Sequence, residues 1–207
     1  MTDLVHVSRL SDAELTRAFR CRAMPFAALV RELHRCGLAQ QVREHLPSEL
    51  REHFDAPPSA ITWIPAVWLE RLLQAIERCV DETEMRAIAR RSIDRRGFIL
   101  MAKMARLAMA RGPIDHHWVA RVFVRALRRQ VRGMSIEYAA DGARGQFEIR
   151  YAHLQEVRAT SFAYWQGLVE GVFGWVDVDL EISRPDIQRT LPSGVQGSFS
   201  IAPQTVV

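Results

Sequence analysis

The chain contains little cysteine: Cys21, Cys36 and Cys79 are the three cysteines among 207 residues. An odd number of cysteines, on segments whose apolar pattern looks helical, predicts reduced thiols rather than a disulfide framework. None of them belongs to a Cys-x-x-Cys pair or to a cysteine–histidine cluster. The spacings of a structural zinc site are therefore missing, and no metal is predicted.

Long apolar runs are also missing. The most apolar stretches, Val67–Ile76 and Phe98–Met101, are interrupted by charged or polar residues well before the roughly 20 apolar residues that a bilayer requires. The first residues lack the basic segment followed by an apolar one that marks a secretory signal. Together these absences predict a protein without a transmembrane segment, and the cytoplasm is the expected compartment.

Lysine is almost absent, since Lys103 is the only lysine among the 28 basic residues. The planar guanidinium group of arginine binds carboxylates and phosphates through two parallel hydrogen bonds, which an ammonium group cannot do. The bias indicates either a GC-rich coding background or the use of arginine for anion binding. The formal net charge of +4 is mild and does not indicate a nucleic-acid partner.

Catalytic signatures are absent as well, including any Gly-rich phosphate loop or nucleophile–histidine–acid spacing. Asp115–His117 could be read as a metal site, but neighbouring residues on a helix point about 100° apart, so a capped helix start is favoured. Asp177, Asp179 and Glu181 could be acid/base groups, yet the solvent side of a sheet explains them better. The chain is predicted not to be an enzyme.

Helical periodicity fills the first 130 or so residues. Apolar residues recur there at three- and four-residue intervals, and proline or acidic residues stand where helices would start. The expected helices begin near Pro25, near Pro47, after Pro65, at Glu82 and near Trp118. This stretch therefore predicts a helical layer.

A period of two replaces the helical period at Met134. Asp141-Gly142 is a typical hairpin turn between two alternating segments, 134–138 and 147–151. A helix from about Thr160, an alternating strand over 176–182 and a shorter strand around 199–201 follow. We predict an α+β domain at residues 25–207, in which helices of the N-terminal two-thirds pack on a late antiparallel four-stranded ββαββ sheet, with residues 1–24 as an extension.

This layout resembles a family of domains of unknown function that occurs as many paralogues in myxobacteria. The resemblance rests on sparse positions between about residues 25 and 203, which are Leu46–Leu50, Trp63–Pro65, Trp68, Leu72-Leu73, Ile88–Arg90, Ser92, the hairpin of 133–151, the helix of 164–171 and Phe199–Ile201. That family has no short catalytic signature. The resemblance therefore implies a fold and no particular activity.

More loosely, helices followed by a late ββαββ unit are similar to the vinyl-reductase-like, heme nitric-oxide-binding and transport-particle-subunit folds. Members of those groups often enclose a pocket for a small molecule, a lipid or heme. This chain lacks the Tyr-x-Ser-x-Arg signature that anchors heme propionates in the nitric-oxide sensors. The resemblance thus implies a pocket, and no cofactor is predicted.

Two arginine clusters are candidate binding residues. Arg91 and Arg95 lie in the segment RRSIDRR, and the second cluster follows one side of the helix that begins near Trp118. Either cluster could be a solvated helix face or a site for a nucleotide, an acidic lipid or an acidic partner surface. The full candidate set is Arg91, Arg95, Arg121, Arg125, Arg128, Arg132, Trp63 and Trp68.

We therefore expect a non-enzymatic sensory or regulatory domain that binds a small hydrophobic or anionic ligand or a protein partner. The pocket is expected between the Trp63–Ile76 helix, the Phe98–Leu107 segment and the inner face of the sheet, with arginines at its rim. One alternative is a ligand-free interaction module that forms a homodimer. Another is nucleotide binding through the arginine clusters.

Overall fold

The structure is a computed structural model that describes residues 19–93, 115–151, 159–176, 178–190 and 194–204. The helices are α2 (Met24–Arg35), α3 (Ala39–Glu44), α4 (Ser48–Asp55), α5 (Ala66–Glu77), α6 (Glu82–Ser92), α8 (His116–Arg128) and α9 (Ala159–Gly174). The strands are β1 (Arg20–Arg22), β2 (Trp63–Pro65), β3 (Val131–Arg132), β4 (Met134–Asp141), β5 (Arg144–Tyr151), β6 (Leu180–Ile182), β7 (Asp186–Thr190) and β8 (Gly194–Pro203).

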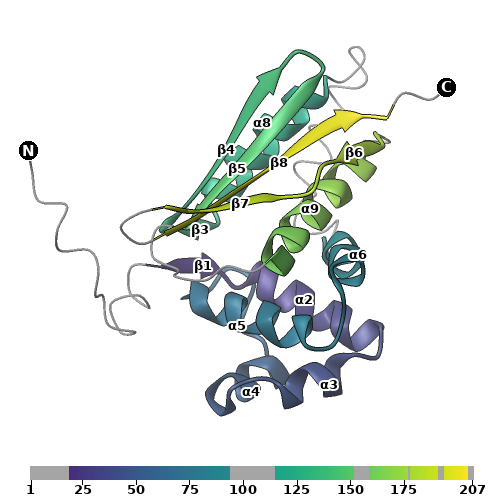
Figure 1. Ribbon diagram of the computed structural model, residues 1–207. Coiled ribbons are helices and arrows are strands. Elements are labelled where there is room, and N and C mark those ends of the chain that lie inside the picture. Colours follow the sequence, from purple (N-terminus) through teal and green to yellow (C-terminus); the bar gives the residue numbers. More distant parts are fainter. Residues whose placement is uncertain (1–18, 94–114, 152–158, 177, 191–193, 205–207) are drawn as a thin grey trace, which may run out of the picture.

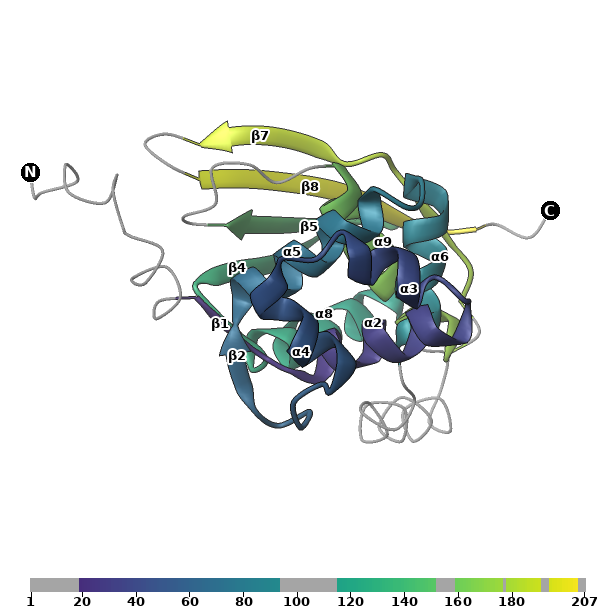
Figure 2. The same ribbon diagram turned by 90° about the horizontal axis from the view of Figure 1, so that it is seen from below.

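The predicted α+β class is confirmed. Helices α2 to α5 form one end of the molecule and a large antiparallel sheet forms the other, with α9 and α6 between them (Figure 1). Seen from below, the described helices lie on one side of strands β4, β5, β8 and β7 (Figure 2). In the described residues no helix is both long and apolar enough to cross a membrane.

The large sheet has five strands rather than the predicted four. Its order is β4-β5-β8-β6, and β7 also pairs with β8. The added strand β7 arises inside the segment 185–197, whose turn-forming residues suggested a loop. The predicted strand over 176–182 is shorter than expected, because only Leu180–Ile182 pairs with β8. Asp179 precedes this strand, and Asp177 lies outside the described residues.

The predicted hairpin is confirmed in place, and its turn consists of Gly142 and Ala143, since Asp141 pairs with Arg144. Gly142 adopts a positive φ of 56°, the left-handed conformation that this two-residue turn requires and that glycine adopts without steric cost. Phe147, Ile149 and Tyr151 of β5 are buried at alternate positions, and Phe147 pairs with Phe199 of β8 across the strands. The alternation therefore places one face of the sheet against the helices.

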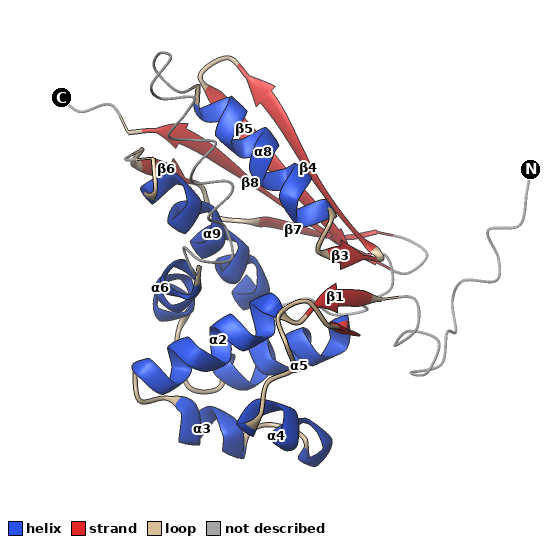
Figure 3. Ribbon diagram, turned by 180° about the vertical axis from the view of Figure 1, so that it is seen from behind, coloured by secondary structure: helices blue, strands red, loops and turns tan. Residues whose placement is uncertain are grey.

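Helix α9 is the central element of the fold, and every residue from Ser161 to Val169 within it is buried. In Figure 3 it lies beside α8, between the sheet and α6. Two glycines allow the close approach: a Cβ on Gly167 would lie 2.2 Å from the backbone oxygen of Arg86 in α6, and one on Gly197 of β8 would lie 2.0 Å from the Phe162 ring of α9. A helix with apolar residues on most of its sides fits such a buried place.

A small second sheet with the order β2-β1-β3 was missing from the sequence prediction. Its strands are two or three residues long and come from segments far apart in the chain, so they leave no alternating pattern to read. Cys21 of β1 pairs with Ile64 of β2 and with Val131 of β3. This sheet consequently holds the start of α5 next to the end of α8.

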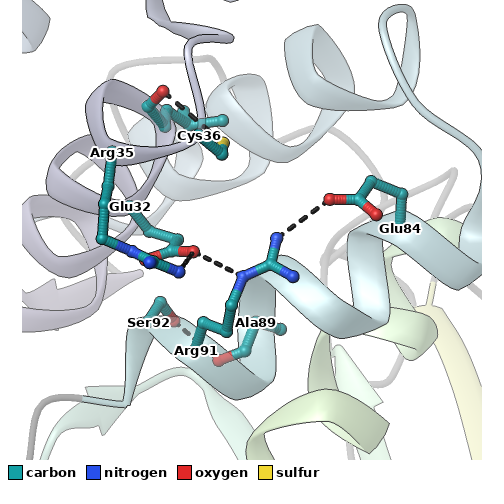
Figure 4. Close-up of polar contacts among 8 residues, drawn as sticks. Glu32, Arg35, Cys36, Glu84, Ala89, Arg91 and Ser92 are labelled. Atoms are coloured by element: carbon teal, nitrogen blue, oxygen red, sulfur yellow. Dashed lines mark hydrogen bonds and ion pairs between the residues drawn. The ribbon is translucent and has the colours of Figure 1, made fainter.

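A buried carboxylate joins helices α2 and α6. Glu32 is 5% exposed and accepts two hydrogen bonds of 2.8 Å from Arg35 and one of 2.6 Å from the Nε of Arg91, whose Nη2 also donates to Glu84 at 2.9 Å (Figure 4). Burial alone would raise the pKa of Glu32, but the hydrogen bonds and charges of Arg35 and Arg91 outweigh it and lower that pKa. The cluster fixes the packing of the two helices.

Replacing Arg91 by methionine is expected to lower the free energy of unfolding by about 1–2 kcal/mol, because a mostly buried Glu32 would keep only Arg35 as its partner. Urea unfolding followed by circular dichroism measures this loss. Arg90→Met is the matched control, since the neighbouring Arg90 is exposed. Equal losses in the two variants would contradict a role for the Glu32 cluster in stability.

Candidate functional site

A cavity of about 170 Å³ lies beneath the first turns of α5. Most of its wall is apolar, and it is open to solvent on one side. The lining residues are Phe19, Cys21, Ala66, Val67, Trp68, Leu69, Glu70, Arg71, Val131, Arg132, Met134, Tyr151 and Trp165. They come from both sheets and from α5 and α9, so the cavity forms only when the two layers pack together.

The small sheet positions the α5 wall of this cavity. Pro65 ends β2 and precedes the helix, and the backbone N–H of Ala66 donates to the oxygen of Phe19 at 3.0 Å. The next residues of α5 are thereby directed toward the end of β5. Trp68 continues the aromatic wall outward, since its ring stacks on His53 at a centroid distance of 4.1 Å and contacts Phe26.

The opposite wall consists of Tyr151 and Trp165. Both are buried, and the indole Nε1–H of Trp165 donates to the hydroxyl oxygen of Tyr151 at 2.5 Å. Burial raises the pKa of Tyr151 well above its ordinary value, and the nearby Glu70 charge adds to this. Tyr151 therefore stays a neutral phenol, and the wall presents aromatic surface with its polar groups paired.

Glu70 is the acidic group of the cavity. Its side chain is of intermediate exposure because it faces the open space, while protein atoms surround it on its other sides. Desolvation by burial raises the pKa of Glu70 from 4.5 to about 7, and a hydrogen bond with Ser161 of α9 lowers it in part. Glu70 thus changes its charge near neutral pH.

The other titratable groups around Glu70 keep their protons at that pH. Burial, and then the charge of Glu70, raises the pKa of Cys21 to about 12. Burial followed by the charges of Cys21 and Glu70 also raises the pKa of Tyr164. A thiol that stays protonated is a poor nucleophile. The arrangement therefore suits binding and proton exchange at Glu70 rather than covalent chemistry.

Two of the predicted binding residues, Trp68 and Arg132, line this cavity. Trp63 lies just outside it, and the guanidinium groups of Arg22 and Arg132 each sit 4.3 Å from the centroid of the Trp63 ring. The structure thus brings part of the predicted set together at one place. Arg71 is a further arginine of the lining, and its Nη1 binds Glu49 at 2.5 Å.

The remaining predicted arginines lie elsewhere. Arg91 belongs to the Glu32 cluster, and Arg95 lies outside the described residues, as does the Phe98–Leu107 segment. Arg121, Arg125 and Arg128 are exposed on α8, where Arg121 contacts Asp115 at 3.3 Å and the Nε of Arg128 donates to the backbone oxygen of Ile136 at 2.9 Å. They form an exposed row, separate from the cavity.

Asp115–His117 forms the start of α8, as expected. Asp115 caps the helix by accepting from the backbone N–H of His117 at 2.9 Å. Ligand atoms of the three residues lie within 4.8 Å of one another. However, the Nε2 atoms of His116 and His117 bind the backbone oxygens of Ala143 and Gly142 at 3.2 Å and 2.9 Å. The Nδ1 atom of His117 also binds the hydroxyl group of Tyr138, so the two histidines contact the hairpin through side-chain hydrogen bonds.

Sequence reasoning missed Glu70, although a signal for it existed. Helix α5 buries Leu69 and Leu73, and Glu70 directly follows the first and precedes the second by three residues. Such a spacing puts a carboxyl group at the border of the apolar face. Acidic residues are almost never fully buried without a partner, so this position was a candidate for a perturbed group.

Comparison with solved structures places the fold among known ones. The described chain shares the fold of H-NOX domains. An oxygen-binding H-NOX domain related to soluble guanylate cyclases superposes with a TM-score of 0.56 at 11% identity, covering 89% of this chain and 95% of that one. A structure addressing H-NOX activation superposes with a TM-score of 0.59 at 10% identity, covering 90% of this chain and 98% of that one. A third structure, from work on heme redox potential and porphyrin distortion, superposes with a TM-score of 0.58 at 11% identity, covering 90% of this chain and 96% of that one.

At such low identity the likeness establishes the fold alone. It confirms the looser resemblance to heme nitric-oxide-binding folds at the level of architecture. No protein-family model and no curated protein matches the sequence. The resemblance to the myxobacterial family therefore stays a prediction.

Proposed function

We propose that the chain is a non-enzymatic sensory or regulatory domain that binds a small, largely hydrophobic ligand in the cavity beneath α5. The cavity itself is the observation that carries this function. Aromatic side chains of two layers line it, and Glu70 is the carboxyl group among its described lining residues. One of the structures with a similar fold is an oxygen-binding domain. This likeness supports a sensory role.

The size of the cavity limits the ligand. Sites for drug-sized molecules span roughly 300–1,000 Å³, whereas this cavity holds about 170 Å³. An apolar cavity of about 150 Å³ in another protein holds benzene. The proposed ligand therefore has about the size of one six-membered ring.

Heme, which is named for one of the similar structures, does not fit the described cavity. A porphyrin contains four five-membered rings, so it is larger than the single ring that a cavity of about 170 Å³ suits. Among the lining residues, Cys21, Met134 and Tyr151 are of types that can bind heme iron. However, burial raises the pKa of the Cys21 thiol to about 12, and the Tyr151 oxygen already accepts from Trp165. Neither the Cys21 thiol nor the Tyr151 phenol is therefore prepared to bind iron.

Thermal unfolding with toluene as the test ligand examines this function. Toluene is expected to raise the melting temperature of the wild-type protein, because a ligand that binds only the folded state stabilises it. Ala66→Phe, which adds a ring to the lining, should abolish that rise. Ala140→Phe adds the same ring at an exposed position of β4 and should keep it. Failure of toluene to stabilise the wild type would contradict the proposal.

A sensory domain also needs an output, and the exposed arginine row on α8 is the proposed contact for a protein partner with an acidic surface. Arg121, Arg125 and Arg128 project from one helix beside the edge strand β4. Charge at the rim of an interface acts mainly on the association rate. Replacing Arg125 by glutamate is therefore expected to slow association with such a partner and to leave toluene binding unchanged, as surface plasmon resonance and thermal unfolding would measure.

A further inference from the structure

The cavity contains a group that hydrophobic binding alone does not require, because the carboxyl group of Glu70 lies among aromatic rings in its lining. Glu70 of α5 lines the cavity together with Cys21 of β1 and Tyr151 of β5. Ser161 of α9 forms a hydrogen bond with Glu70, and the charge of Glu70 acts on Cys21, on Tyr151 and on Tyr164 of α9. Each of these four groups is neutral near pH 8. The carboxylate is consequently the one negative charge that they surround.

The hydrogen bonds of the described residues leave this carboxylate with spare acceptor capacity. Two carboxylate oxygens offer about four lone pairs, and the Ser161 hydroxyl is the donor that acts on the pKa of Glu70. The nearby indole N–H of Trp165 donates to Tyr151 instead. A donor on a ligand in the cavity would therefore find an acceptor that the protein itself satisfies only in part.

The two arginines of the lining do not neutralise this charge. Arg71 binds Glu49, and the guanidinium group of Arg132 lies over Trp63. Neither contributes to the pKa of Glu70, which is set by burial and by Ser161. Each guanidinium group therefore lies against another partner, and an anionic ligand would meet the negative charge of Glu70.

We propose that the cavity selects a small primary amine, whose ammonium group pairs with the Glu70 carboxylate while its apolar body, about the size of one ring, packs among Phe19, Trp68 and Trp165. This inference rests on the proposed function and names the ligand class of the same cavity. The sequence leaves a hydrophobic or an anionic ligand open, whereas the proposed ligand is a cation with an apolar body.

Three physical effects favour this ligand. An ammonium group offers three donors to the lone pairs that Glu70 has left. Aromatic faces attract cations, and the lining supplies several such rings. A charge-assisted hydrogen bond in a partly desolvated site is also about twice as strong as a neutral one. The raised pKa of Glu70 agrees, because burial sets it and a cationic partner would lower it.

Calorimetric titration with benzylamine tests the proposal, and benzyl alcohol serves as the neutral molecule of the same shape. Near pH 8, where Glu70 is ionised, the wild-type protein is expected to bind benzylamine about tenfold more tightly than benzyl alcohol. Glu70→Gln keeps the shape of the side chain and removes its charge. It should weaken benzylamine by about tenfold and leave benzyl alcohol within about threefold.

A second measurement needs no variant. Near pH 5.5 Glu70 is protonated in the wild-type protein, so benzylamine should lose most of its advantage over benzyl alcohol. Ligand-induced shifts of the tryptophan indole signals in NMR spectra would place the binding at this cavity.

The outcomes separate the ligand class from the function on which it rests. Equal affinities for benzylamine and benzyl alcohol, unchanged in Glu70→Gln, would overturn the amine proposal and leave a hydrophobic binding domain. Binding of neither molecule, together with no stabilisation by toluene, would overturn both. Preference for benzylamine that depends on Glu70 and on pH would support both.

Discussion

Replacing Glu70 by glutamine is expected to stabilise the protein by about 3 kcal/mol near pH 8 and to change its stability little near pH 5, since each unit of pKa shift corresponds to about 1.4 kcal/mol. The reason is the raised pKa of Glu70, which is about 7 in the folded protein, whereas an unperturbed carboxyl group in the unfolded chain has a pKa of 4.5. Between these values the folded state holds a proton that the unfolded state has released. The wild-type protein therefore loses stability as the pH rises through this window.

The amide in the Glu70→Gln variant has no such dependence and can still accept from Ser161. Urea unfolding of both proteins at several pH values between about 5 and 8 measures the difference. Glu137→Gln supplies the control, because Glu137 lies on the exposed part of β4. A wild-type-to-variant difference that stays constant with pH would show that Glu70 titrates as it would in water.

The second large effect is expected at Gly167, where alanine should lower the free energy of unfolding by about 2–3 kcal/mol. The new Cβ would lie 2.2 Å from the backbone oxygen of Arg86 and 2.7 Å from the Cβ of Ala89. Neither atom belongs to a flexible side-chain end, so α6 and α9 must separate. The better helix propensity of alanine, about 1 kcal/mol, offsets only part of this cost.

Thermal unfolding should show the melting temperature of Gly167→Ala falling by roughly 5–10 °C, the scale for a domain of this length. Gly174→Ala is the matched control, because it is the last residue of the same helix and a Cβ there meets nothing within 4 Å. The control should unfold at or slightly above the wild-type temperature. Similar losses in both variants would mean that the contact between α6 and α9 yields easily.

The sequence predicted the elements whose pattern is local. Asp141-Gly142 between two alternating segments was enough for the hairpin, and Asp115 was enough for the start of α8. The strands β1, β2 and β7 were missed because their pairing depends on partners distant in the chain or on a segment rich in turn residues. Local patterns carry no information about such pairing.

The candidate site was predicted in part for the same reason. The prediction placed a pocket beside the helix after Pro65, with arginines at its rim, and named Trp68 as a binding residue. The cavity lies beside that helix, and Trp68 and Arg132 line it. The pKa of Glu70, by contrast, is set by its burial and by Ser161, and Glu70 shares the cavity with Tyr151; these two residues lie about 90 and 80 residues further along the chain. The packing of α9 against α5 brings them together, and no pattern within one segment could show it.

The central place of α9 also constrains how the chain can be made. Helices α2, α5 and α6 bury their apolar faces against one another and against a helix that is synthesised after residue 158. Until that helix leaves the ribosome, the N-terminal half has no complete core, and its apolar surfaces stay open to chaperones or to aggregation. We expect nascent chains stalled before α9 to be digested rapidly by protease, and those stalled well beyond β8 to resist it.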